Sequence, residues 1–125
     1  MSREVEFRGK DVEGKWHYGL LAVLPENIRM LQKGHYISNA AGLPFAYQVR
    51  PETVGQYTGL KDCKARKIYE RDIVRHAVGW VGKVHYIEGT FEIEATHQSW
   101  PANYARCGKI EVIGNLDDNP ELLRG

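Results

Sequence analysis

Residues 80–95 read WVGKVHYIEGTFEIEA, and this stretch decides the fold class. Its apolar residues recur at every second position, which is the spacing of a β-strand and not of a helix. The dipeptide Glu88-Gly89 separates two such runs, and glycine at this place is typical of a tight hairpin turn. We therefore predict two strands joined at Glu88-Gly89, with Phe91, Ile93 and Ala95 facing inward.

Short alternating segments also lie on both sides of this hairpin. Residues 73–74 begin a strand before it, and residues 110–114 form another after it. Gly79 and Gly82 stand where a strand of a small barrel would bend sharply to close. The region from Ile68 to Asn115 therefore predicts an SH3-like small barrel.

The N-terminal half also consists of short segments with apolar residues at every second position. Residues 5–22 predict a β-hairpin whose loop holds Gly9 and Gly14, with its aromatic residues facing inward. Residues 45–49 predict a further strand, which Pro51 ends because proline cannot donate to a sheet ladder. Residues 38–44 are rich in small residues, and we expect this segment to be mobile.

The predicted fold is thus mainly β, with helical structure limited to short turns. One such turn is expected at the end of the chain, where Asn119 precedes Pro120 as a capping residue. We expect a single domain over residues 1–125, with an N-terminal β-hairpin subregion at 1–60 and a barrel subregion at 61–125.

The overall charge of the chain is too small for it to bind nucleic acid through its net positive charge. The chain has 17 Lys and Arg against 16 Asp and Glu, which gives a formal net charge of +1. A strong basic field of the kind that attracts phosphate backbones is therefore absent from the molecule as a whole. Any argument from charge must rest on a local cluster.

The cysteines and histidines predict neither a disulfide nor a metal site. Cys63 and Cys107 lie far apart, and the N-terminal residues show no basic-then-apolar signal segment, so we expect a cytoplasmic protein with two unpaired thiols. The five histidines form no HxH or HExxH pattern. We expect no cofactor and no metal.

Residues 51–74, PETVGQYTGLKDCKARKIYERDIV, and residues 110–123, IEVIGNLDDNPELL, resemble the YopX family of small phage and prophage proteins. The N-terminal strings REVEFRG and GKWHYG also resemble the way these proteins begin. The resemblance implies a β-rich fold with an SH3-type barrel in its second half and an origin in a phage or prophage gene. It implies no catalytic residues.

Two positions depart from the pattern of that family. Where its members commonly have Asn-Gly this chain has Lys64-Ala65, and Arg71 replaces the glycine of Glu-Gly-Asp. Glycine at such places usually permits a positive φ, which costs other residues roughly 1 kcal/mol. Either the backbone relaxes to negative φ here, or Ala65 and Arg71 are mildly strained.

A basic stretch from Lys61 to Arg75 is the first candidate site. It includes Arg66, Lys67 and Arg71, and beside exposed aromatic rings it could grip a phosphate backbone. Acidic residues interleave with these bases, however, so a solvated turn is the simpler interpretation. A nucleic-acid-binding module is therefore the alternative function and not the leading one.

Aromatic residues form the second candidate, since the chain has three Trp, seven Tyr and three Phe. Most of them fall on the inward phase of their strands and are expected in the core, namely Phe7, Trp16, Tyr18, Phe45, Tyr47, Tyr86 and Phe91. The rings near turns are better candidates for an interface, namely Tyr36, Trp80, Trp100 and Tyr104.

Catalysis has the weakest support. Glu70 and Asp72 stand two apart with His76 beyond them, but no nucleophile elbow, phosphate loop or metal cluster accompanies them. The acidic residues Asp117 and Asp118 could instead pair with the basic stretch of a neighbouring copy.

The leading hypothesis is a non-enzymatic phage or prophage accessory protein that binds another protein or another copy of itself. The candidate binding residues are Arg66, Lys67, Arg71, Trp80, Trp100 and Tyr104. We expect no membrane partner, because the chain has no long apolar run.

Overall fold

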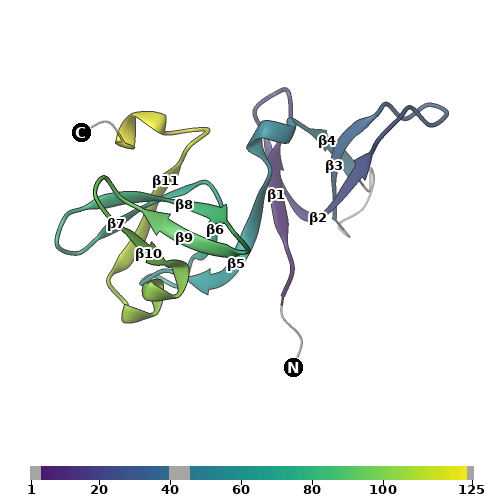
Figure 1. The fold of residues 1–125 in the computed structure, drawn as a ribbon. Helices are drawn as coiled ribbons and strands as arrows, with labels where there is room; N and C mark the ends of the chain where they lie inside the picture. The colour runs from purple at the N-terminus through teal and green to yellow at the C-terminus, as the bar shows by residue number, and fades with distance from the viewer. Residues whose placement is uncertain (1–3, 40–45, 124–125) are drawn as a thin grey trace. The chain divides into compact units, whose positions relative to one another are not determined.

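The computed structural model describes residues 4–39 and 46–123, and the chain divides into two compact units at residues 1–56 and 57–125. Both units are built from antiparallel strands, and the helices within the described residues are short 3-10 turns (Figure 1). The prediction of a mainly β fold is confirmed. Of the segment expected to be mobile, residues 40–44 lie outside the described residues.

The first unit is an antiparallel sheet in the strand order β4-β3-β2-β1-β5, in which Gly55 and Gln56 of β5 pair with β1. The predicted N-terminal hairpin is confirmed, and residues 11–15 join its two strands. The elements are β1 (Phe7–Lys10), β2 (Trp16–Leu24), β3 (Gly34–Ser38), β4 (Ala46–Val49), the 3-10 helix η1 (Pro51–Thr53) and the start of β5 (Gly55–Lys61).

The second unit holds a five-stranded antiparallel sheet in the order β10-β9-β8-β7-β11. Four strands follow one another as a meander, and the fifth returns after a short helix to pair with the first, as expected for an SH3-like arrangement. Within the described residues no ladder joins β10 to β11, so the hydrogen bonding does not close a barrel. The elements are the remainder of β5, β6 (Lys67–Tyr69), β7 (Asp72–His76), β8 (Val81–Ile87), β9 (Thr90–Glu94), β10 (Ser99–Pro101), η2 (Ala102–Cys107), β11 (Ile110–Asn115) and η3 (Pro120–Leu123).

The core of the second unit is aliphatic. Its buried members come from the predicted hairpin, from strands on both sides of it and from η2, namely Ile68, Val74, Val84, Ile93, Ala105 and Ile110. The predicted turn between β8 and β9 is confirmed, because Glu88 and Gly89 have φ angles of 50° and 86°. Both residues therefore have the positive φ that a type I′ two-residue hairpin loop requires.

The prediction of an aromatic core is wrong for Tyr18 and Tyr86, which are 45% and 53% exposed. In β2 the inward position belongs to His17, whose ring stacks on Tyr47 at 3.9 Å and whose Nε2 lies 2.8 Å from Asp11 Oδ2. His17, whose ring is hydrogen-bonded to Asp11, thus takes the inward position that was expected for the aromatic residues of this strand. Phe7, Trp16, Tyr47 and Phe91 are partly buried, and Phe45 lies outside the described residues.

Ala65 and Arg71 both have positive φ, at 63° and 78°, so the backbone has not relaxed at either departure from the family pattern. At Arg71 the surrounding strands hold the conformation, because its N–H donates to the Val84 carbonyl and its carbonyl accepts from the Leu116 N–H. At Ala65 the N–H donates to the Asp62 carbonyl. The strain is therefore fixed by the turns and by their tertiary contacts.

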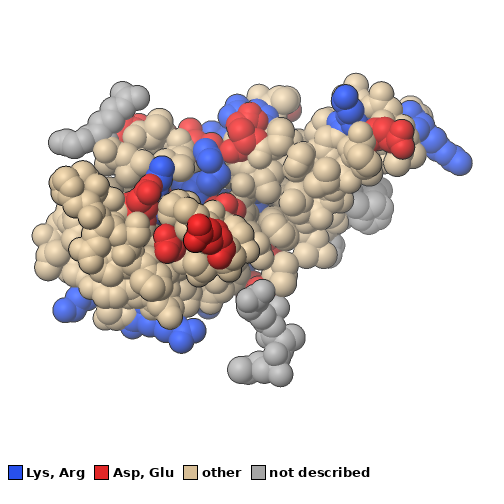
Figure 2. Space-filling model, viewed as in Figure 1, with Lys and Arg blue, Asp and Glu red and all other residues tan. Residues whose placement is uncertain are grey.

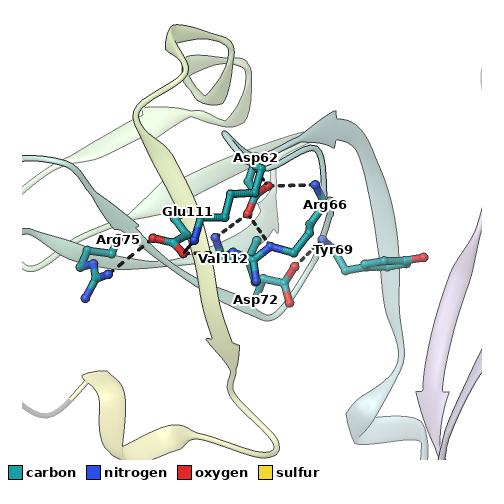
Figure 3. A network of polar contacts seen from close by, with 8 residues as sticks. Asp62, Arg66, Tyr69, Asp72, Arg75, Glu111 and Val112 are labelled. Carbon is teal, nitrogen blue, oxygen red and sulfur yellow. Dashed lines mark hydrogen bonds and ion pairs between the residues drawn. The ribbon is translucent and has the colours of Figure 1, made fainter.

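The Asp62 carboxylate joins the turn at residues 62–66 to the last strand (Figure 3). Its Oδ1 accepts the N–H groups of Lys64 and Arg66, each at 2.9 Å, and its Oδ2 accepts the Val112 N–H, also at 2.9 Å. The Arg66 side chain adds a contact from Nε to Oδ2 at 3.1 Å. One buried carboxylate therefore meets three backbone donors and a guanidinium.

These contacts set the protonation of Asp62. Burial by itself raises the pKa of this carboxyl group, but the hydrogen bonds from the Val112, Arg66 and Lys64 N–H groups and the charge of Arg66 outweigh it. The pKa of Asp62 therefore lies below its ordinary value of 3.8. The carboxylate contributes stability above that value, and this contribution is lost as the pH falls through the lowered pKa.

Replacing Ala65 with glycine should relieve the positive φ at this turn. We expect Ala65→Gly to raise the free energy of unfolding by up to about 1 kcal/mol in urea denaturation. Ala77 is a matched control, because it is an exposed turn alanine that is absent from the positive-φ positions. Ala77→Gly should be neutral or destabilising, and equal effects of the two substitutions would show that Ala65 is not strained.

Replacing Asp62 with asparagine should uncouple the turn from β11. We expect Asp62→Asn to lower the free energy of unfolding at neutral pH by about 2 kcal/mol or more, since an amide group cannot accept from all of these donors. The variant should also lose less stability than the wild type between pH 6 and about pH 3. Glu121→Gln, which changes an exposed acid, serves as the control. Matching stability and acid sensitivity in Asp62→Asn and the wild type would refute this assignment.

Candidate binding site

The six candidate residues fall into two groups with different surroundings. Arg66, Lys67 and Arg71 lie on β6 and the turns beside it, where they contact acidic or aromatic residues of the same chain. Trp80, Trp100 and Tyr104 contact one another through stacked rings. We describe the basic group first.

Glu111 of β11 gathers three cations of the basic stretch (Figure 3). Its carboxylate oxygens lie 3.0 Å from Lys64 Nζ, 3.2 Å from Arg66 Nη2 and 3.5 Å from Arg75 Nη2. The hydrogen bond from Lys64 and the surrounding positive charges hold the pKa of Glu111 below its ordinary value. The single negative charge of Glu111 is therefore shared by three of the cations in this stretch.

The remaining two candidates of this group are also engaged within the chain. Arg71 makes a paired contact with Asp117, at 2.9 Å from Nη2 to Oδ1 and 3.1 Å from Nε to Oδ2. The Lys67 ammonium lies 5.1 Å from the centre of the Tyr57 ring. The sequence suggested that Asp117 could pair with a neighbouring copy, but in the structure it pairs with Arg71 of its own chain. Figure 2 shows acidic and basic groups side by side on the face it presents.

Two of the residues considered for catalysis, Asp72 and His76, each accept a hydrogen bond from a backbone N–H group of a nearby turn. Asp72 is buried and accepts the Tyr69 N–H at 2.7 Å, so its carboxylate shapes the turn that precedes β7. His76 points into the aromatic group, where its Nδ1 accepts the Val78 N–H at 3.0 Å. An Nδ1 that accepts leaves the proton of the neutral ring on Nε2, which lies 3.5 Å from the Tyr104 hydroxyl.

Four rings from separate segments stack on one another in the second unit. The planes of Trp80 and Trp100 are 5° apart with centroids at 4.3 Å, and Trp100 stacks on Tyr104 at 5.8 Å. His76 completes the set, at 5.1 Å from Trp80 and 5.9 Å from Tyr104. We call these four residues the aromatic stack. Offset stacking of this kind contributes roughly 0.5–1.5 kcal/mol per pair beyond the burial of the rings.

The fold supports the aromatic stack from beneath. Trp80 and Tyr104 pack against the aliphatic core, while Trp100 lies on β10 opposite Ile93 of β9. The sequence identified Trp80, Trp100 and Tyr104 from their places near turns but considered His76 only as a catalytic residue. Its ring joins the stack through tertiary contacts that no local pattern reveals.

A groove of about 590 Å³ opens beside the two tryptophans. We call it the aromatic groove. It is lined by Gly79, Trp80, Val81, Ala95, Thr96, His97, Gln98, Trp100, Leu122 and Leu123. The volume lies within the range of known ligand-binding clefts, and the mixture of aromatic and aliphatic walls is typical of them.

The C-terminal 3-10 helix η3 forms one wall of the groove. The predicted closing turn is confirmed at Pro120–Leu123, and it packs close to Gly114 of β11. A Cβ atom at position 114 would lie 2.6 Å from Asn119 Oδ1 and 2.9 Å from a Leu122 methyl carbon, so a larger residue here would displace these side chains. Leu122 and Leu123, which the sequence did not single out, become groove residues in this way.

The structure offers little to a metal ion. Within residues 4–39 and 46–123, no three His, Cys, Asp or Glu side chains are grouped as metal ligands would be. Cys63 and Cys107 are both exposed free thiols. In the same described residues, no helix combines the length and the apolar character needed to cross a membrane.

Comparison with known proteins identifies the family. No curated protein matches the chain. The crystal structure of protein EF1440 from Enterococcus faecalis is similar, with a TM-score of 0.60 over 98% of this chain and 99% of that one, at 20% identity, and so shares the fold. The family model for YopX protein matches residues 6–124, nearly the whole sequence. The chain therefore belongs to the YopX family.

Proposed function

We propose that this protein is a non-catalytic module that binds another protein through the aromatic groove. The observation that carries the proposal is the meeting of Trp80, which directly precedes β8, and Trp100 of β10 on the wall of one groove of about 590 Å³. Tryptophan and tyrosine dominate the energetics of protein interfaces because they bury large areas at low entropic cost. Rings already held by a packed core lose little further freedom when a partner binds.

The alternative, a nucleic-acid module that uses the stretch from Lys61 to Arg75, has weaker support. Binding to phosphates gains affinity from cations that are available to replace counterions. Here Lys64, Arg66 and Arg75 share Glu111, and Arg71 is paired with Asp117. A phosphate backbone would have to compete with these carboxylates for the same cations.

Membership of the YopX family supports a biological setting for this module. We infer an accessory protein of phage or prophage origin that acts in the cytoplasm of a bacterial host. Its partner is a host protein, a phage protein or another copy of the chain. Asp72 accepts the Tyr69 N–H and His76 Nδ1 accepts the Val78 N–H, and these contacts, which shape turns, support a role without catalysis.

A charge placed on the groove wall should abolish partner binding without unfolding the protein. Leu123 is suitable because it lines the groove and is 38% exposed, and Ile87 is a matched control that is 43% exposed and lies outside the lining. We expect Leu123→Glu to lose the proteins that tagged wild type captures from its native cell, by at least tenfold in quantitative mass spectrometry. Ile87→Glu should retain them.

The nucleic-acid alternative is tested in parallel by titrating single- and double-stranded DNA and RNA at low salt. We expect no binding that falls steeply with added salt. Such binding, combined with capture that is unchanged in Leu123→Glu, would reverse the ranking of the two functions.

A further inference from the structure

We propose that the occupant of the aromatic groove is an uncharged, proline-rich segment of the partner in the polyproline II conformation. This inference rests on the proposed function, since it names the chemistry of the ligand for the same site. Three properties of the groove carry it: its charge, the state of the neighbouring sheet edges and the arrangement of the indole rings.

The groove is nearly free of charge. Among the described residues that line it, His97 is the only ionisable one. A smaller adjoining hollow adds Lys83 and Glu94, but these two form an ion pair at 3.4 Å. A charged ligand segment would lose its hydration here and gain no counter-charge, so electrostatic complementarity favours a neutral one.

The edges of the five-stranded sheet are poor templates for an added strand. At one edge β10 is only three residues long and ends at Pro101, which has no N–H to donate. At the other edge, Cys63 donates to the Ile110 carbonyl and Asp62 accepts the Val112 N–H. The edges of this sheet therefore favour a ligand that binds through ring and side-chain contacts over one that adds a strand.

The indole rings suit a polyproline ligand. Trp80 and Trp100 are partly buried and stack on each other with parallel planes, and both line the groove beside the aliphatic Val81 and Leu123. Proline-rich segments dock on aromatic-lined grooves of this kind because their extended helix is formed before binding and little entropy is lost. The backbone of such a segment has no internal hydrogen bonds, so its carbonyls are available to polar groove residues such as Gln98.

The inference is tested with a blocked oligoproline peptide about ten residues long. Trp16 is replaced by phenylalanine throughout, so that only the groove tryptophans emit. We expect a saturable change in tryptophan fluorescence on adding the peptide and no such change with a blocked Gly-Ser peptide of equal length. The Leu123→Glu variant should bind at least tenfold more weakly, and Ile87→Glu should bind like its parent.

Absence of saturable binding at peptide concentrations up to about 1 mM would overturn the ligand assignment. If Leu123→Glu nevertheless loses its captured partner, the proposed function stands and only the ligand chemistry is wrong. If Leu123→Glu also captures its partner as well as the wild type does, both proposals fail. Saturable binding of an oligothymidylate that Leu123→Glu abolishes, without oligoproline binding, would assign the groove to nucleic acid instead.

Discussion

The buried carboxylate of Asp62 is the interaction on which the rest of the second unit depends. It fixes the turn at residues 62–66 through two backbone N–H groups and reaches β11 through a third, at Val112. β11 in turn carries Glu111, which gathers the basic side chains, and Gly114, against which the C-terminal turn packs. A single acid in the middle of the chain thereby binds the strand that carries both Glu111 and the residue against which one wall of the groove packs.

This arrangement explains why the two groups of candidate residues have such different characters. On β11 and the turns near it, Asp62, Glu111 and Asp117 each meet a cation, so the local excess of positive charge in the sequence is partly offset in the folded chain. Where Trp80, Trp100 and Tyr104 meet, aromatic rings instead stack on one another. Apolar surface held rigid by a core is better suited to binding than cations already paired with carboxylates.

Much of the fold follows from local patterns, while the site depends on contacts between distant residues. The period-2 spacing and the Glu88-Gly89 dipeptide predict the β8–β9 hairpin because both act over a few residues. The inward phase of β2 was missed because Asp11 and Tyr47 make a buried histidine acceptable. The pairs Arg71–Asp117 and Asp62–Val112 join residues 46 and 50 positions apart, a separation that no local rule addresses.

The central claim is that Trp80 and Trp100 form a preorganised contact surface for a neutral partner segment. The most direct test is a heteronuclear NMR titration that follows the three indole N–H signals of the protein as oligoproline is added. The account predicts that the signals of Trp80 and Trp100 shift together and saturate, while the signal of Trp16 stays in place. Shifts confined to Trp16, or to the backbone N–H groups of residues 62–66, would contradict it.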